Sequence, residues 1–139
     1  MKATLKVLPS LQRKLDSLET LVEQQVERKL VDIAESAVTL SPVDTGAYVT
    51  SFSFSVGRGR PRGKSSRGRL KANGQAMRQE GLDNLKNDLK KIPSLMDTTS
   101  ITLRNNSPHA TAVEYGGKGW ITPPYFVFTK LRNIHGQYL

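Results

Sequence analysis

Residues 10–40 read SLQRKLDSLETLVEQQVERKLVDIAESAVTL, and this stretch decides the fold because its apolar side chains recur at steps of three and four. That spacing places them on one face of a long helix. Ser10 can cap the first turn, and Pro42 disfavours helical backbone at Ser41, so we expect the helix to end near Leu40. The apolar positions of this face are Leu11, Leu15, Leu18, Val22, Val26, Leu30, Ile33 and Ala37.

The apolar face of this helix admits two roles. It can pack against the core of its own domain, or it can form a heptad seam through which the chain associates with itself. A helix of roughly 30 residues is longer than a small domain usually covers, so the two roles are compatible. Both interpretations stay open from the sequence.

The residues after the long helix favour a sharp turn. Asp44 can accept hydrogen bonds from the backbone amides that follow it, and Gly46 permits backbone geometry closed to other residues. We therefore interpret Pro42, Asp44, Thr45 and Gly46 as a structural turn that redirects the chain from a helix into a strand.

Alternation with a period of two predicts strands farther along the chain. Residues 52–56 alternate Phe, Ser, Phe, Ser and Val, which predicts a strand with one buried face. Residues 100–105 alternate in the same way and predict a second, half-buried strand that ends in a turn-prone Asn-Ser-Pro segment. The β-branched and aromatic residues within 110–115 predict a short third strand before a glycine-rich loop.

Two further segments complete the expected fold. Residues 75–92 favour a second helix, which Gly81 weakens by about 1 kcal/mol and Pro93 ends. Residues 123–134 fit either a strand or a short helix with proline in its first turn. We expect a single α+β domain over residues 1–139, with the long N-terminal helix packed on a small, mainly antiparallel sheet, a second shorter helix and a basic flexible loop.

Several classes of protein are disfavoured by composition. The chain has no cysteine, which excludes disulfides, thiolate metal sites and a cysteine nucleophile. No stretch approaches the roughly 20 apolar residues of a membrane span. Catalysis would need a nucleophile with a base, a carboxylate pair or a metal cluster, and no motif supplies one. We therefore expect a protein made in the cytoplasm, without a membrane partner, metal or cofactor, and not an enzyme.

The net charge of +9 is concentrated in one segment. Residues 1–56 sum to −1 and residues 72–139 to +3, whereas residues 57–71 carry +7 without an acidic side chain. We expect a flexible loop at about residues 57–74, because it has almost nothing apolar to bury. Its cations are Arg58, Arg60, Arg62, Lys64, Arg67, Arg69 and Lys71.

Three interpretations of this basic loop remain open. It can be a solvated excursion with no partner, or it can bind DNA phosphates or an acidic protein through charge alone. The run Arg-Gly-Arg-Pro at residues 58–61 also resembles the core of AT-hook segments, in which arginines enter the minor groove of A·T-rich DNA.

Three segments, taken in order, resemble one family of proteins. They are AVTLSPVDTG at residues 37–46, NSPHATAVEYG at residues 106–116 and TPPYF at residues 122–126. They are similar to the neck, head-to-tail joining and tail-completion proteins of tailed bacteriophages, including the minor tail protein Z type. That family commonly shows a long first helix, a P-x-D-T-G turn, a Y-A-x-x-V-E-[FY]-G stretch and a late P-x-x-F segment. Here His109-Ala110 stands at the Y-A position, and Tyr48-Val49 stands where Leu-Arg often follows the turn.

The resemblance implies a structural virion protein at the head-tail joint. Identical subunits would form a homo-oligomeric ring, six- or twelve-fold, between the portal or head-closure proteins and the tail-terminator or tail proteins, with genomic DNA passing through the channel. Cyclic rings use heterologous contacts, and aromatic residues often carry the energy of such interfaces. We expect the interface to include Glu114, Tyr115, Trp120, Tyr125 and Phe126, and the basic loop to face DNA or an acidic neighbour.

A free nucleic-acid-binding protein is the alternative. In that interpretation the Arg/Gly-rich loop carries the function and the α+β body only presents it. The near-neutral remainder of the chain and the lack of a recognition helix or a base-stacking platform weigh against it.

Overall fold

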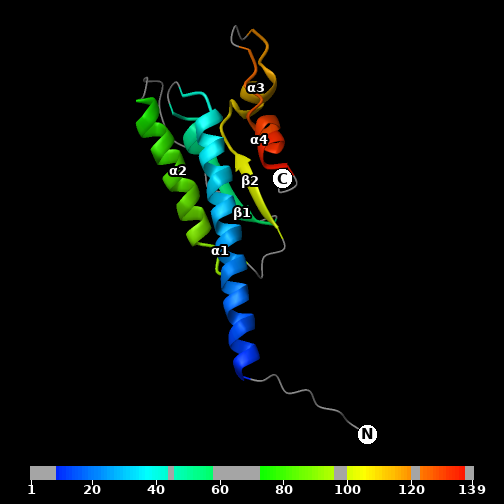
Figure 1. Ribbon diagram of the computed structural model, residues 1–139. Coiled ribbons are helices and arrows are strands. Elements are labelled where there is room, and N and C mark those ends of the chain that lie inside the picture. Colours follow the sequence, from blue (N-terminus) through cyan, green and yellow to red (C-terminus); the bar gives the residue numbers. More distant parts are fainter. Residues whose placement is uncertain (1–8, 44–45, 58–72, 96–99, 120–122, 137–139) are drawn as a thin grey trace.

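The computed structural model describes residues 9–43, 46–57, 73–95, 100–119 and 123–136. Its elements follow in the order α1, a short 3-10 helix η1, β1, α2, β2, α3 and α4 (Figure 1). The mixture of helices with a small antiparallel sheet, led by a long N-terminal helix, confirms the predicted α+β class.

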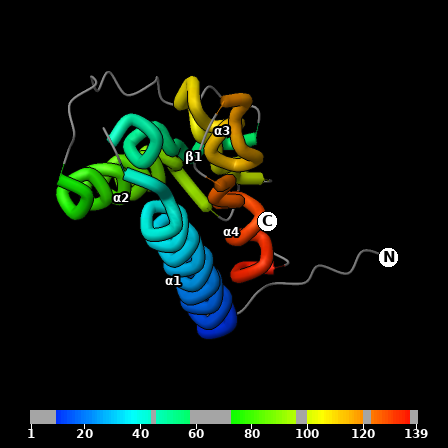
Figure 2. The backbone as a smooth tube through the Cα atoms, turned by 90° about the horizontal axis from the view of Figure 1, so that it is seen from above, coloured from blue at the N-terminus to red at the C-terminus, as the bar shows by residue number. Residues whose placement is uncertain are grey.

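Helix α1 spans Pro9–Leu40 and runs along the long dimension of the described fold (Figure 1). One face of its C-terminal part is buried, with Ala34 and Ala37 fully inaccessible to solvent. Helices α2 and α4 lie on opposite sides of this buried part, as the view along α1 shows (Figure 2). The N-terminal half of α1 extends beyond them.

The sheet consists of two antiparallel strands, β1 at Phe52–Val56 and β2 at Ile101–Asn105. The register pairs Phe52 with Asn105 and Val56 with Ile101. Both strands lie where the period-two alternation predicts them. Alternation identifies strands because successive side chains point to opposite faces of the sheet.

The prediction that β1 has one buried face is wrong. Ser53 and Ser55 are buried together with Phe52 and Phe54. The small serine side chains allow other elements to cover both faces of β1, so polar character at these positions does not mark a surface. The hydroxyl oxygens of Ser53 and Ser55 have no hydrogen-bond partner among the described residues.

Helix α2 spans Gly74–Lys90, as the apolar spacing predicts. Its N-terminus is capped by Asn73, whose side-chain oxygen accepts the backbone N–H of Ala76 at 3.1 Å. Gly81, which weakens the helix by intrinsic propensity, sits where α2 closely approaches Val49 and Val38. A Cβ at Gly81 would clash with the carbonyl oxygen of Val49 and lie 3.3 Å from a methyl group of Val38.

The prediction of a third strand is also wrong, because residues Ala110–Tyr115 form helix α3. The preceding turn starts the helix locally. The Ser107 hydroxyl accepts the N–H of His109 at 3.2 Å, and the His109 carbonyl accepts the N–H of Val113 at 2.9 Å. A hydrogen-bonded start of this kind outweighs the β propensity of a six-residue segment. Helix α3 ends at Gly116, whose φ of 85° favours glycine.

Of the two alternatives left open for the last segment, the helix is correct. Helix α4 spans Val127–His135 and begins after the prolines instead of containing one in its first turn. Val127 and Leu131 are fully buried and join the hydrophobic core. The core therefore gathers side chains from α1, α2, α3, α4 and β1 between the packed part of α1 and the sheet.

Candidate assembly interface

The described residues show no cluster of three or more His, Cys, Asp or Glu side chains able to hold a metal ion. His135 is buried, and its Nε2 lies 3.0 Å from the hydroxyl of Ser36. Burial and the charge of Lys29 lower the pKa of His135, against the opposite influence of Asp32. This contact ties α4 to α1. The absence of an enzymatic role stays a prediction.

The predicted turn after α1 lies partly within the described residues. Gly46 has a φ of 84°, and its carbonyl accepts both the N–H and the hydroxyl of Thr50, at 3.1 and 2.6 Å. These bonds redirect the chain from α1 into η1 at Val49–Ser51 and then into β1. Pro42 is half-buried beside the turn, while Asp44 and Thr45 lie outside the described residues.

Two charged side chains stabilise the end of α1 and the edge of β1. No pattern in the sequence indicates either of them. The guanidinium of Arg78 donates to the carbonyls of Val38 and Ser41, each at 3.2 Å, and so satisfies acceptors that the end of α1 leaves unpaired. A carboxylate oxygen of Asp88 accepts the N–H of Phe54 at 3.1 Å along the open edge of β1. Both belong to α2, and only long-range packing identifies them.

Glu114, predicted at a subunit interface, acts within the subunit. Its buried carboxylate accepts the N–H groups of Phe128 and Thr129, at 2.8 and 3.0 Å, and the Thr129 hydroxyl at 2.9 Å. These are the unpaired donors of the first turn of α4, where a negative charge is also stabilised by the helix dipole. Glu114 therefore fixes α4 against α3, and its place at a subunit interface stays a prediction.

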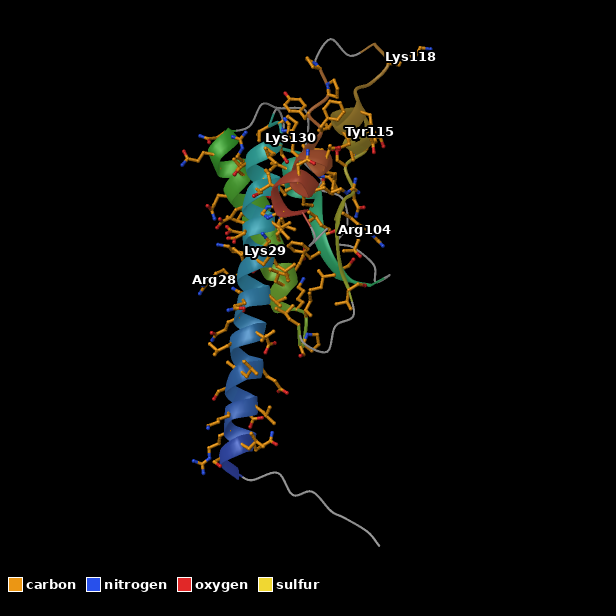
Figure 3. The ribbon with its side chains drawn as sticks, turned by 45° about the vertical axis from the view of Figure 1, so that its right-hand side comes forward. Arg28, Lys29, Arg104, Tyr115, Lys118 and Lys130 are labelled. Atoms are coloured by element: carbon orange, nitrogen blue, oxygen red, sulfur yellow. The ribbon has the colours of Figure 1, made fainter. Side chains whose placement is uncertain are left out.

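The other predicted interface residues divide by exposure. Tyr115 is 69% exposed and Phe126 is 41% exposed. Tyr125 is half-buried and packs against the core, while Trp120 lies outside the described residues. We call Tyr115 and Phe126 the aromatic end. Figure 3 shows Tyr115 and Lys118 at the end of the molecule opposite the N-terminus of α1.

The backbone brings the two exposed aromatics together. The N–H of Phe126 donates to the carbonyl of Glu114 at 3.3 Å, and the N–H of Tyr125 donates to the carbonyl of Val113 at 2.8 Å. Phe126 also has a φ of 50°, the left-handed region that an L side chain adopts at a cost. The fold thus holds an apolar ring at the surface in an unfavourable backbone conformation.

A second exposed apolar surface lies on residues 10–28 of α1, which we call the free half. Its apolar stripe is exposed at every position, from 36% at Val26 to 57% at Leu18. Toward the body the stripe runs into a groove of about 590 Å³ whose lining includes Ile33, Leu95 and Ile101. The stripe consists of Leu11, Leu15, Leu18, Val22 and Val26.

Strand β2 offers a third surface, its outer edge. The bonds from Gly57 N–H to the Ser100 carbonyl, and from Asn106 N–H to the Ser51 carbonyl, fix which residues pair with β1. The alternation of an antiparallel ladder then directs the backbone groups of Ile101, Leu103 and Asn105 away from β1. This edge has no strand partner among the described residues, and such edges readily pair with another chain.

The predicted basic loop, residues 57–74 with its seven Lys and Arg, lies almost wholly outside the described residues. The described residues contain 12 Lys and Arg against 10 Asp and Glu, which is close to neutral. Most of the excess of positive charge therefore lies outside the described residues. Among the described residues, no helix is long and apolar enough to span a bilayer.

Comparisons with protein-family models, with curated proteins and with solved structures find no match for this chain.

Proposed function

We propose that this chain is a structural subunit of the head-to-tail joint of a tailed bacteriophage. Copies would form a six- or twelve-fold ring between the portal or head-closure proteins and the tail-terminator or tail proteins. The observation that carries the proposal is the presence of two separate apolar surfaces, the apolar stripe and the aromatic end, at opposite ends of the described fold. It adds to the resemblance of residues 37–46, 106–116 and 122–126 to neck proteins.

A ring at a joint needs one surface for its neighbouring copies and another for the proteins above and below it. In a cyclic assembly the contact between neighbours is heterologous, so the two copies contribute different residues to it. Leu18 and Tyr115 expose apolar surface to water, and a neighbouring subunit that covers this surface is stabilised on the ring by its burial. The outer edge of β2 supplies backbone donors and acceptors with which a strand of a neighbouring subunit can pair.

The segments that resemble the neck family sit at structural junctions. Gly46 redirects α1 into η1 and β1, and Glu114 joins α3 to α4. Phe126 begins the turn into α4 and remains exposed. These residues have structural roles that need no catalysis, which agrees with an assembly function.

The basic loop is the part of this proposal that concerns DNA. In a ring around the DNA channel, its seven cations would face the phosphates in the lumen or an acidic neighbouring protein. Its charge localisation also favours the second candidate function, a free nucleic-acid-binding protein, because the near-neutral body would serve only to present the loop.

Mass spectrometry of purified phage particles distinguishes the two functions. The neck role predicts the chain at a fixed copy number per particle and weak DNA binding by the isolated protein. A variant of equal length with the seven cations replaced by Gly and Ser provides the matched test of the loop. Absence from particles, together with tight, salt-sensitive DNA binding that this variant loses, would assign the chain to the free nucleic-acid-binding class.

The aromatic end has its own test within the same assay. Replacing Tyr115 with Ser removes a surface ring without touching the core, so we expect normal folding and reduced incorporation into particles. Thr111→Ser, on the exposed side of the same helix, is the control and should incorporate normally. Equal incorporation of both variants would remove Tyr115 from the interface.

A further inference from the structure

The free half of α1 lacks a covering element in the described fold. Burial begins at Ile33, and every residue from 10 to 28 is exposed except the half-buried Glu23, which accepts the N–H of Leu95. The segment is roughly 27 Å long at 1.5 Å per residue. An amphipathic helix draws most of its stability from packing of its apolar face, so the apolar stripe points to a missing partner.

Charges of opposite sign flank the apolar stripe. At 100° per residue, Lys14 and Arg28 fall on one side of the stripe, whereas Glu19 and Glu23 fall on the other. A helix with one basic flank and one acidic flank is complementary to another copy of itself. The charge pattern therefore identifies a second copy of this chain as the partner.

Two of these charges, Lys14 and Glu19, favour one direction of pairing. If Leu15 and Val22 take heptad position a and Leu18 takes position d, then Lys14 is at position g and Glu19 at position e. In a parallel pair, position g faces position e of the following heptad on the other helix, so Lys14 meets Glu19. An antiparallel pair sets g against g and e against e, which brings like charges together.

We propose that residues 11–26 of α1 pack in parallel against the same segment of a second copy, with the apolar stripe at the seam. The contact needs only another copy of the chain, so it stands independently of a place in the phage neck. It is also compatible with a ring, because rotation about a ring axis leaves neighbouring helices that lie along the axis parallel.

Disulfide trapping tests this contact cleanly, because the natural chain has no cysteine. Chains carrying Lys14→Cys are mixed with chains carrying Glu19→Cys and are oxidised. We expect a dimer with one chain of each kind, at roughly tenfold the yield of either variant alone, since a tenfold preference corresponds to a modest interaction energy. In the control, Gln24→Cys on the opposite side of the helix replaces Glu19→Cys and should give no mixed dimer.

A second measurement removes the seam itself. Leu15→Glu with Leu18→Glu should weaken self-association at least tenfold in sedimentation experiments. Because both side chains are exposed within one subunit, unfolding of the dilute protein should be unchanged. A mixed-dimer yield equal to that of the Gln24→Cys control, or self-association unaffected by the two glutamates, would overturn the parallel contact. A ring found in particles without the 14–19 disulfide would keep the neck role and remove only this contact.

Discussion

The two halves of α1 have the same apolar spacing and opposite surroundings. Leu18, in the free half, is 57% exposed, whereas Ile33, in residues 29–40, which we call the packed half, is 2% exposed. Helices α2 and α4 cover the packed half, and no described element covers the apolar stripe. The difference shows that periodicity identifies the apolar face of a helix but not the element that covers it. The packed half is covered by elements of the same chain, and we infer that a second copy covers the free half.

The largest effect that separates the halves is expected from truncating one side chain in each. Ile33→Ala removes a fully packed side chain and leaves a cavity, so the free energy of unfolding should fall by about 2–5 kcal/mol. Leu18→Ala should change it by less than about 0.5 kcal/mol in the dilute chain, because the side chain is already in water. Urea unfolding at low protein concentration measures both. Equal losses would contradict the division of α1.

The close contact of α2 with η1 and with α1 gives the next effect. Gly81→Ala places a Cβ against the backbone of Val49 and near Val38, and should cost about 1–3 kcal/mol through overpacking, despite the better helix propensity of alanine. Gly74→Ala is the matched control, because a Cβ there meets its nearest atom at 3.6 Å. Thermal unfolding compares them, and a Gly81→Ala protein as stable as the control would show that the helices do not approach so closely.

A smaller effect is expected where α4 is fixed against α3. Glu114→Gln keeps one acceptor but removes the charge that binds the first turn of α4, so we expect a loss of about 1–2 kcal/mol. Thr129→Val, which removes only one of the three hydrogen bonds, should cost less. Chemical unfolding orders the two variants. If the glutamine variant instead folds normally but fails to assemble, Glu114 belongs to the interface as first predicted.

The smallest effect concerns His135, which joins α4 to Ser36 in the packed half. Its pKa in the folded chain lies below the ordinary value of 6.5. The folded state therefore favours the neutral ring, and its contribution to stability is complete above pH 6.5 and declines as the pH falls below that value. Unfolding of the wild type and of His135→Gln at pH 7.5 and 6.0 should show a larger decrease for the wild type. Identical decreases would exclude the histidine as the cause.

Much of the fold follows from local pattern. The long helix, the second helix and both strands lie where three-and-four or period-two spacing predicts them, because these spacings reflect backbone geometry directly. The β propensity of Val113 and Tyr115 favours a strand at residues 110–115, whereas the turn that starts helix α3 depends on the hydroxyl of Ser107. Alternation does not reveal that the serines of β1 are buried, because coverage of a sheet face depends on tertiary packing.

The sequence predicts only part of the candidate interface. Tyr115 and Phe126 could be selected as aromatics near turns, but their exposure depends on how α3 and α4 pack. Glu114 belongs to a segment that resembles the neck family, but that resemblance does not predict that its carboxylate caps α4. Arg78 and Asp88 could not be identified in advance, since their partners lie 34 to 40 residues away in the chain. The spacing of the apolar stripe was evident, whereas its lack of a covering element needed the structure.

Cryo-electron microscopy of the particles that contain this chain tests the central claim most directly, because it locates the subunit and the surroundings of α1 together. We predict a ring between the portal and the tail in which the free halves of neighbouring α1 helices run parallel, with Lys14 beside Glu19 of the next copy. A ring in which the apolar stripe faces solvent would contradict the self-packing of α1. Absence of any density for the chain at the head-tail joint would contradict the neck function itself.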